Sequence, residues 1–131
     1  MSRVPFLSKP FTLGDLTLKN RNIMASLTRN RNVPTNVPND TVQEYYVQRA
    51  RGGASLILSE GTLVSQQGTE WPHAPGIWND EHIAAWKKIT DAVHDAGAYM
   101  FCQVSRTVGV RATATWLMSY TALARRSGCS S

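Results

Sequence analysis

The amino-acid sequence predicts an α/β fold in which the strands of a parallel sheet alternate with helices. The expected elements follow one another as a hairpin, strand, helix, strand, helix and strand. Alternation of this kind favours a parallel sheet with right-handed crossovers. A parallel sheet is covered on both faces, and three strands cannot close on themselves. We therefore expect the opening part of a (β/α)8 barrel, with a small doubly wound domain as the alternative.

The amino-terminal quarter of the sequence predicts a hairpin, a strand and a long loop. Residues 11–13 and 16–18 alternate on either side of Gly14-Asp15, which is typical of a tight β-turn. The apolar run Asn22–Ser26 is the first candidate for a buried strand. Residues 30–39 contain two prolines and four asparagines and therefore predict a loop.

The first helix and the second sheet strand come next in the sequence. Asn39 and Asp40 can each cap a helix N-terminus, and apolar residues follow them at helical spacing. The pair Gly52-Gly53 is expected to end this helix. The continuous apolar run Ser55–Ser59 then predicts a buried strand.

A long loop, a second helix and a third strand complete the regular pattern. Residues 60–78 are rich in glycine and proline and predict the loop. The helix is expected to begin at Asn79 or Asp80 and to end at Gly97. Its expected inward stripe consists of Ile83, Trp86, Ile89, Val93 and Ala96. The run Ala98–Gln103 predicts the third strand.

The charge of the chain is concentrated after Gln103. Lysine and arginine total 14 against 9 acidic residues. No acid follows Gln103, whereas four arginines do, namely Arg106, Arg111, Arg125 and Arg126. The preceding residues are therefore close to neutral, and we expect no nucleic-acid partner, since the basic balance belongs to the tail.

Metal, secretory and membrane roles are not expected. The two cysteines, Cys102 and Cys129, are too few for a disulfide framework or a metal site. No metal-ligand spacing relates the three histidines, which are His73, His82 and His94. Pro5 interrupts the N-terminus before any apolar secretory segment, and no run approaches the length of a membrane span. We therefore expect a cytoplasmic protein without a membrane partner.

Several different motifs follow one another in order across residues 5–103. They are Asn22–Arg31, Glu44–Ala50, Ser59–Thr62, Ala74–Trp78, Ala85–Lys88 and Phe101–Gln103. Together they resemble the Old Yellow Enzyme family of FMN-dependent ene-reductases. The resemblance implies an incomplete TIM barrel and an NAD(P)H oxidoreductase that reduces the C=C bond of α,β-unsaturated carbonyl compounds.

The resemblance also implies five cofactor-binding residues near the ends of the three strands. Backbone groups of Ser26 and Leu27 would flank the flavin ring, and the Thr28 hydroxyl would hydrogen-bond it near O4. Gly61 would let the backbone approach the ring because it has no side chain. The Gln103 amide would bond the pyrimidine edge. Apart from the resemblance, Thr28 could be a cap, Gly61 a plain turn and Gln103 an exposed strand end.

The resemblance places the catalytic apparatus outside this chain, so we expect no catalytic residue here. The absent parts are the His/Asn pair that binds the substrate carbonyl, the proton-donating tyrosine and the phosphate site. We therefore expect a truncated, inactive chain with weak affinity for FMN. The alternative is a non-enzymatic half-barrel that associates with itself or another protein through its uncovered strand edge.

The sequence pattern changes after Gln103. The family usually continues Leu-Trp-His-Val-Gly-Arg here, whereas this chain continues Val104-Ser105-Arg106. Codons for Gln103–Ser105 can contain a splice-donor sequence. Codons for Leu123–Ser131, read one base later, can encode Trp-His-Val-Gly-Arg. We therefore expect residues 104–131 to be an irregular, non-family tail, in which Val104–Thr121 are translated from a retained intron and the residues after them are read in a shifted frame. A divergent tail is the alternative.

Overall fold

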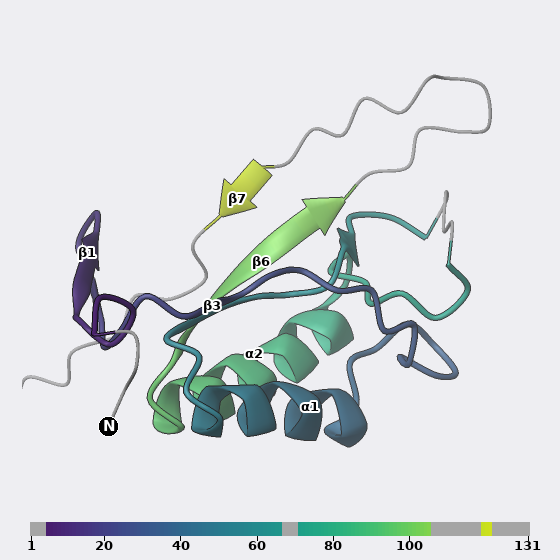
Figure 1. Ribbon diagram of the computed structural model, residues 1–131. Coiled ribbons are helices and arrows are strands. Elements are labelled where there is room, and N and C mark those ends of the chain that lie inside the picture. The colour runs from purple at the N-terminus through teal and green to yellow at the C-terminus, as the bar shows by residue number, and fades with distance from the viewer. Residues whose placement is uncertain (1–4, 67–70, 106–118, 122–131) are drawn as a thin grey trace, which may run out of the picture.

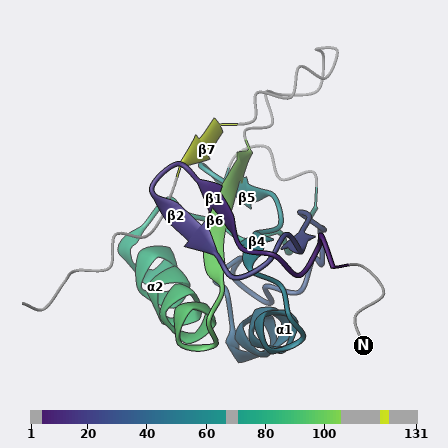
Figure 2. The same cartoon turned by 60° about the vertical axis from the view of Figure 1, so that its left-hand side comes forward.

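The computed structural model describes residues 5–66, 71–105 and 119–121. It contains a small two-stranded sheet, a larger mixed sheet and two helices. Figures 1 and 2 show the two helices side by side across one face of the larger sheet. No helix in the described ranges is long and apolar enough to cross a membrane.

The expected hairpin is confirmed. Strands β1 (Phe11–Leu13) and β2 (Leu16–Leu18) pair antiparallel, with Phe11 opposite Leu18. Gly14 in the connecting turn has φ +57°, a left-handed conformation that glycine adopts at no steric cost. Leu18 is fully buried and so anchors the hairpin to the rest of the protein.

The larger sheet has the order β3-β4-β6-β5. The three predicted strands are β3 (Ile23–Met24), β4 (Leu56–Leu58) and β6 (Tyr99–Ser105), and they pair parallel in chain order. The short strand β5 (Thr62–Leu63) was missed, because it lies in the stretch expected to be loop. It pairs parallel with β6 beyond the end of β4, so the chain rejoins the sheet after a break at residues 59–61.

Both helices begin where the asparagine caps predict. Helix α1 (Asp40–Arg51) starts after Asn39, whose side chain accepts from the Val42 N–H. Helix α2 (Asp80–Asp95) starts after Asn79, whose side chain accepts from the His82 N–H. Each bond satisfies a backbone donor that has no partner inside the helix.

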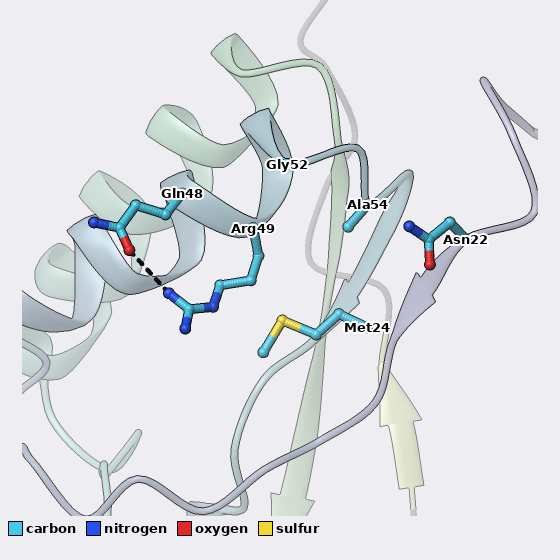
Figure 3. Close-up of a pocket in the computed structure, with 6 residues that line it drawn as sticks. All are labelled: Asn22, Met24, Gln48, Arg49, Gly52 and Ala54. Atoms are coloured by element: carbon cyan, nitrogen blue, oxygen red, sulfur yellow. Dashed lines mark hydrogen bonds between the residues drawn. The ribbon is translucent and has the colours of Figure 1, made fainter. Parts of the chain in front are cut away.

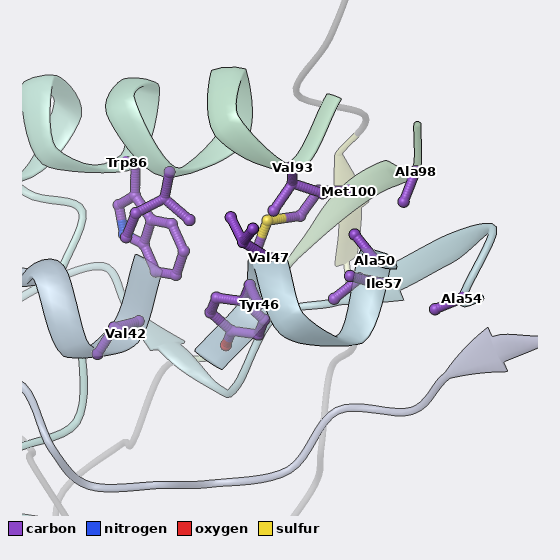
Figure 4. Packing of buried hydrophobic residues seen from close by; sticks show 11 residues of the cluster. Val42, Tyr46, Val47, Ala50, Ala54, Ile57, Trp86, Val93, Ala98 and Met100 are labelled. Atoms are coloured by element: carbon purple, nitrogen blue, oxygen red, sulfur yellow. The ribbon is translucent and has the colours of Figure 1, made fainter. Parts of the chain in front are cut away.

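The core lies between the two helices and the sheet (Figure 4). Its fully buried members include Tyr46 of α1, Ile57 of β4 and Ile89 and Val93 of α2. Burial of such side chains contributes about 1.5–3 kcal/mol each and orients both helices on the sheet. The predicted stripe of α2 is wrong at Ile83, which is 55% exposed, because the first turn buries the neighbouring His82 instead, which is 1% exposed.

The structure differs from the expected irregular tail at five residues. Val104 and Ser105 continue β6, and β7 (Ser119–Thr121) pairs antiparallel with Cys102–Val104. Figures 1 and 2 show β5 and β7 on opposite sides of β6. An open strand edge presents unpaired backbone groups that a passing segment can satisfy. The remaining tail residues lie outside the described residues.

Candidate functional site

The structure brings the five predicted site residues to one end of the parallel sheet. Ser26, Leu27 and Thr28 lie in the loop that follows β3, Gly61 follows β4, and Gln103 lies in β6. Since these strands are parallel neighbours, their carboxyl ends meet at the same edge. That edge is where barrels of this kind place their ligands. The flavin contacts themselves stay a prediction.

The predicted residues are accessible and their side chains offer free polar groups. Leu27 is 51% exposed and Thr28 is exposed, while Ser26, Gly61 and Gln103 are half-buried. Within the described part of the chain, the Thr28 hydroxyl and the Gln103 side-chain amide have no hydrogen-bond partner. Both groups remain available to a ligand that can donate and accept hydrogen bonds.

Ser59 joins the end of β4 to β6. Its buried hydroxyl oxygen accepts from the Gln103 N–H at 3.0 Å, and the hydroxyl donates to the Glu60 carbonyl at 2.8 Å. The Thr62 hydroxyl donates to the same carbonyl at 3.0 Å. These bonds fix the turn that contains Gly61 against the backbone of Gln103.

Glu60 joins the end of β4 to the loop after β3. Its side chain is buried, with 1% of the residue exposed. Its carboxylate accepts from the Arg29 N–H at 2.9 Å, the Asn30 N–H at 3.2 Å and the Asn32 side-chain amide at 3.4 Å. The Glu60 N–H donates to the Tyr46 hydroxyl at 2.8 Å. A buried charge is retained only with such partners, so this set determines the local backbone.

Sequence reasoning missed the roles of Glu60, Asn32 and Tyr46. The available signal was an acidic residue directly after the apolar run Ser55–Ser59, where a buried strand ends. An acid at that point must either reach solvent or find donors within the protein. Its donors lie 28–31 residues earlier in the chain, so spacing alone could not identify them.

The asparagine-rich loop is held by hydrogen bonds between its asparagine side chains and the backbone of residues 72–74. Asn30 and Asn36 have φ of +55° and +62°, a conformation that asparagine tolerates better than most residues. The His73 N–H donates to the Asn30 side chain at 2.8 Å, and the Asn36 amide donates to the Ala74 carbonyl at 2.7 Å. The predicted loop is therefore ordered by long-range hydrogen bonds that begin beside the site.

Burial further favours the neutral forms of two groups near the site, the Tyr46 phenol and the Cys102 thiol. Desolvation is the main cause that raises the pKa of Tyr46 above its usual range, and it also raises the pKa of the Cys102 thiol. A neutral phenol can donate and accept hydrogen bonds but does not act as a general base. A neutral thiol is a poor nucleophile. Among the described residues there is also no group of three or more side chains that could hold a metal ion.

A groove of about 440 Å³ lies away from the predicted residues. Its lining residues are Asn22, Met24, Gln48, Arg49, Gly52 and Ala54, drawn in Figure 3. Asn22 and Ala54 precede β3 and β4, so the groove is toward the amino ends of the strands. In Figure 3 the Arg49 guanidinium lies beside Gln48, to whose side-chain oxygen it donates at 3.0 Å. Since ligands of such barrels bind at the opposite face, we assign no site to this groove.

The sequence profile of the NADH:flavin oxidoreductase / NADH oxidase family matches residues 6–117. This range runs past Gln103, at which we expected the family resemblance to end. An NADP-dependent oxidoreductase, lnbE, of Aspergillus flavus is 48% identical over 98 residues, which are 75% of this chain and 26% of that protein. A 12-oxophytodienoate reductase-like protein of Solanum lycopersicum is 44% identical over 103 residues, or 79% of this chain and 28% of that protein.

Solved structures agree with the sequence matches. The Old Yellow Enzyme homologue from Zymomonas mobilis is 51% identical, with a TM-score of 0.71 over 76% of this chain and 28% of its own. A morphinone reductase in complex with tetrahydroNAD is 45% identical, with a TM-score of 0.71 over 76% of this chain and 27% of its own. The expected incomplete TIM barrel is therefore confirmed, and the chain spans about a quarter of the curated relatives. The chain belongs to the NADH:flavin oxidoreductase / NADH oxidase family, and its similarity to an Old Yellow Enzyme homologue agrees with this assignment.

Proposed function

We propose that this chain supplies the flavin-facing ends of the first three strands of an FMN-dependent NAD(P)H oxidoreductase. The enzyme would reduce the C=C bond of small α,β-unsaturated carbonyl compounds. The observation that carries the proposal is the meeting of Thr28, Gly61 and Gln103 at one end of the parallel sheet. The relatives that are reductases of 12-oxophytodienoate and of morphinone support the same chemistry.

The polar groups at this end fit the ring of FMN. The pyrimidine edge of a flavin presents carbonyl oxygens and a ring N–H, so it needs both donors and acceptors. The Thr28 hydroxyl and the Gln103 amide provide both and have no partner among the described residues. Gly61 leaves room beside them because it has no side chain. When bound, FMN would accept hydride from NAD(P)H and pass it to the substrate.

We further propose that the chain by itself is inactive and binds FMN weakly. Its residues would hold and orient part of the ring, while the substrate pair, the proton donor and the phosphate site would belong to parts of a complete barrel outside residues 5–103. Weak binding follows because the phosphate contributes charge-assisted bonds that this site does not offer. A cytoplasmic location and the absence of nucleic-acid and membrane partners remain proposals from the sequence.

Titration of the isotope-labelled chain with FMN, followed by NMR and by visible flavin absorbance, tests the proposal. We expect weak, saturable shifts at Leu27, Thr28 and Gln103, and no consumption of NADPH with an enone substrate. Gln103→Leu should weaken binding by several-fold, because a hydrogen bond contributes about 0.5–1.5 kcal/mol. Gln48→Leu, which changes an exposed glutamine at the distant groove, should bind as the wild type does.

FMN-induced shifts away from Leu27, Thr28 and Gln103 would contradict the proposed flavin site. Shifts confined to Gln48 and Arg49 would move the flavin to the groove. Tight, stoichiometric flavin with NADPH turnover would show that the chain is a competent enzyme.

A second candidate function is non-enzymatic association through an open strand edge. Strand β3 has one hydrogen-bonded neighbour, β4, in the described sheet. Its Ile23 side chain is 46% exposed. An apolar edge strand of this kind favours pairing with another chain, whether a second copy or another barrel fragment.

A further inference from the structure

We propose that Glu60 is a positioning residue that fixes the β3 loop, residues 25–32, in its flavin-facing conformation. The inference rests on the proposed function, because it concerns the same end of the sheet. Glu60 does not belong to the five predicted flavin contacts, yet it contacts the segment that contains three of them. Its carboxylate would act through the backbone of the loop and would not touch the flavin.

The contact between Glu60 and the β3 loop has the geometry of a backbone anion site. The consecutive N–H groups of Arg29 and Asn30 both donate to the same carboxylate oxygen, at 2.9 and 3.2 Å. Asn30 has φ +55°, and a left-handed residue in such a turn makes successive N–H groups converge. The other oxygen accepts from the Asn32 amide at 3.4 Å. Because the acceptor is charged, these bonds are stronger than bonds between neutral groups.

The same residue is fixed to the other two strand ends through its backbone. The Glu60 carbonyl accepts from the hydroxyls of Ser59 and Thr62, and the Ser59 hydroxyl oxygen accepts from the Gln103 N–H. The Glu60 N–H donates to Tyr46 of α1. Glu60 thus connects the three strand ends. Its backbone is linked to the end of β6 through the Ser59 hydroxyl, and its carboxylate bonds the β3 loop.

The surroundings of Glu60 argue against a direct role in acid–base chemistry. The space beside its carboxylate is about 10 Å³ and is enclosed by Arg29, Arg31, Thr41, Val42 and Tyr45. A cavity of that size holds about one water molecule at most. A substrate or flavin cannot reach a carboxylate that is 1% exposed behind these side chains. Positioning is the role that remains.

Amide hydrogen exchange of the full chain tests the proposal without a flavin. Glu60→Gln keeps the shape of the side chain but removes the charge. It also replaces one acceptor oxygen with an NH₂ group, which can only donate hydrogen bonds. We expect exchange at Arg29 and Asn30 to become faster by about tenfold or more, as a charged hydrogen bond implies. Glu44→Gln makes the same chemical change at an exposed residue whose side chain accepts from Gln48, its one hydrogen-bond partner among the described residues, and it should leave these amides unchanged.

Tyr46→Phe separates positioning from general loss of stability. This variant removes the hydroxyl that binds the Glu60 N–H but leaves the carboxylate and its three donors in place. It should destabilise the whole fold and increase exchange throughout, without a selective effect at Arg29 and Asn30. The proposal is overturned if Tyr46→Phe exposes these two amides as selectively as Glu60→Gln does, or if Glu60→Gln leaves them protected.

Titration of the same variants with FMN relates the β3 loop to the flavin. If the proposed function holds, Glu60→Gln should weaken the FMN-induced shifts at Leu27 and Thr28 more than those at Gln103. Absence of any FMN-induced shift in the wild-type chain would contradict the proposed function. The exchange measurements would still decide whether Glu60 holds the loop.

Discussion

At the residue scale, the main determinants of the site are polar side chains that tertiary structure buries. Glu60, Asn32, Ser59 and His82 are all at most 1% exposed. Their partners come from distant parts of the chain or from helix caps, so each is stable only in the folded arrangement. A change in the protonation of His82, the group among them whose pKa burial shifts, should therefore be visible in the stability of the protein.

His82 predicts a fall in stability at mildly acidic pH. Burial is the main cause that lowers its pKa from the usual 6.5, and nearby Glu81 opposes the shift. Because the folded-state pKa is depressed, the unfolded chain binds more protons below pH 6.5, and stability falls as pH decreases. Urea denaturation from about pH 7.5 to about 5.5 should show this loss in the wild type and in His73→Gln, and a flatter profile in His82→Gln. Equal slopes for all three proteins would contradict the assignment to His82.

Residue roles were only partly predictable from the sequence. The positions of Thr28, Gly61 and Gln103 at one end of the sheet could be predicted because they stand at predicted strand ends, while their contacts with a flavin stay a prediction. Glu60 could not be assigned, because a buried carboxylate is explained only by donors that the fold brings to it. The exposure of Ile83 was also missed, since apolar spacing favoured Ile83 over the adjacent polar His82, which is the residue that the fold buries.

At the element scale, local signals predicted the hairpin, both helices and the three parallel strands. Asparagine caps and apolar runs are local features, so sequence reasoning could find these elements. Strands β5 and β7 are two and three residues long and exist through pairing with β6. No local pattern encodes such pairing, which is why both were missed.

The open edge of β3 leads to an element-scale prediction. Ile23 is an exposed residue of this edge strand, and a lysine there should disfavour pairing with another chain. If the chain associates through the edge, Ile23→Lys should shift its elution in size-exclusion chromatography toward the monomer. Ile83→Lys alters a similarly exposed isoleucine on α2 and should leave the elution unchanged. A monomeric wild type, or an equal shift in both variants, would contradict association through β3.

At the scale of the whole molecule, the regular β/α pattern stops after β6. Each earlier step from β3 to β4 and from β4 to β6 crosses over through a helix and returns parallel. Parallel strands require such a crossover, whereas antiparallel strands do not. The next described strand, β7, returns antiparallel to β6. The departure from the barrel pattern therefore lies between Ser105, the last residue of β6, and Ser119, the first residue of β7, on the carboxyl side of Gln103, where the family motif changes.

The change of motif and the change of strand direction both follow Gln103, which supports our proposal that residues 104–131 form a non-family tail. In this proposal Val104–Thr121 are translated from a retained intron and the residues after them are read in a shifted frame. The family profile matches as far as residue 117, which instead favours a tail that belongs to the family. The sequence of the mature transcript distinguishes the two alternatives. We expect the mature transcript to join the Gln103 codon to codons for Leu-Trp-His-Val-Gly-Arg and to continue in frame into the rest of a barrel. A mature transcript that retains the codons for Val104–Thr121, or a gene without a splice donor after the Gln103 codon, would contradict the proposal. In the first case the antiparallel β7 would be a genuine feature of the protein, occupying the edge of β6 where a barrel would place its next parallel strand.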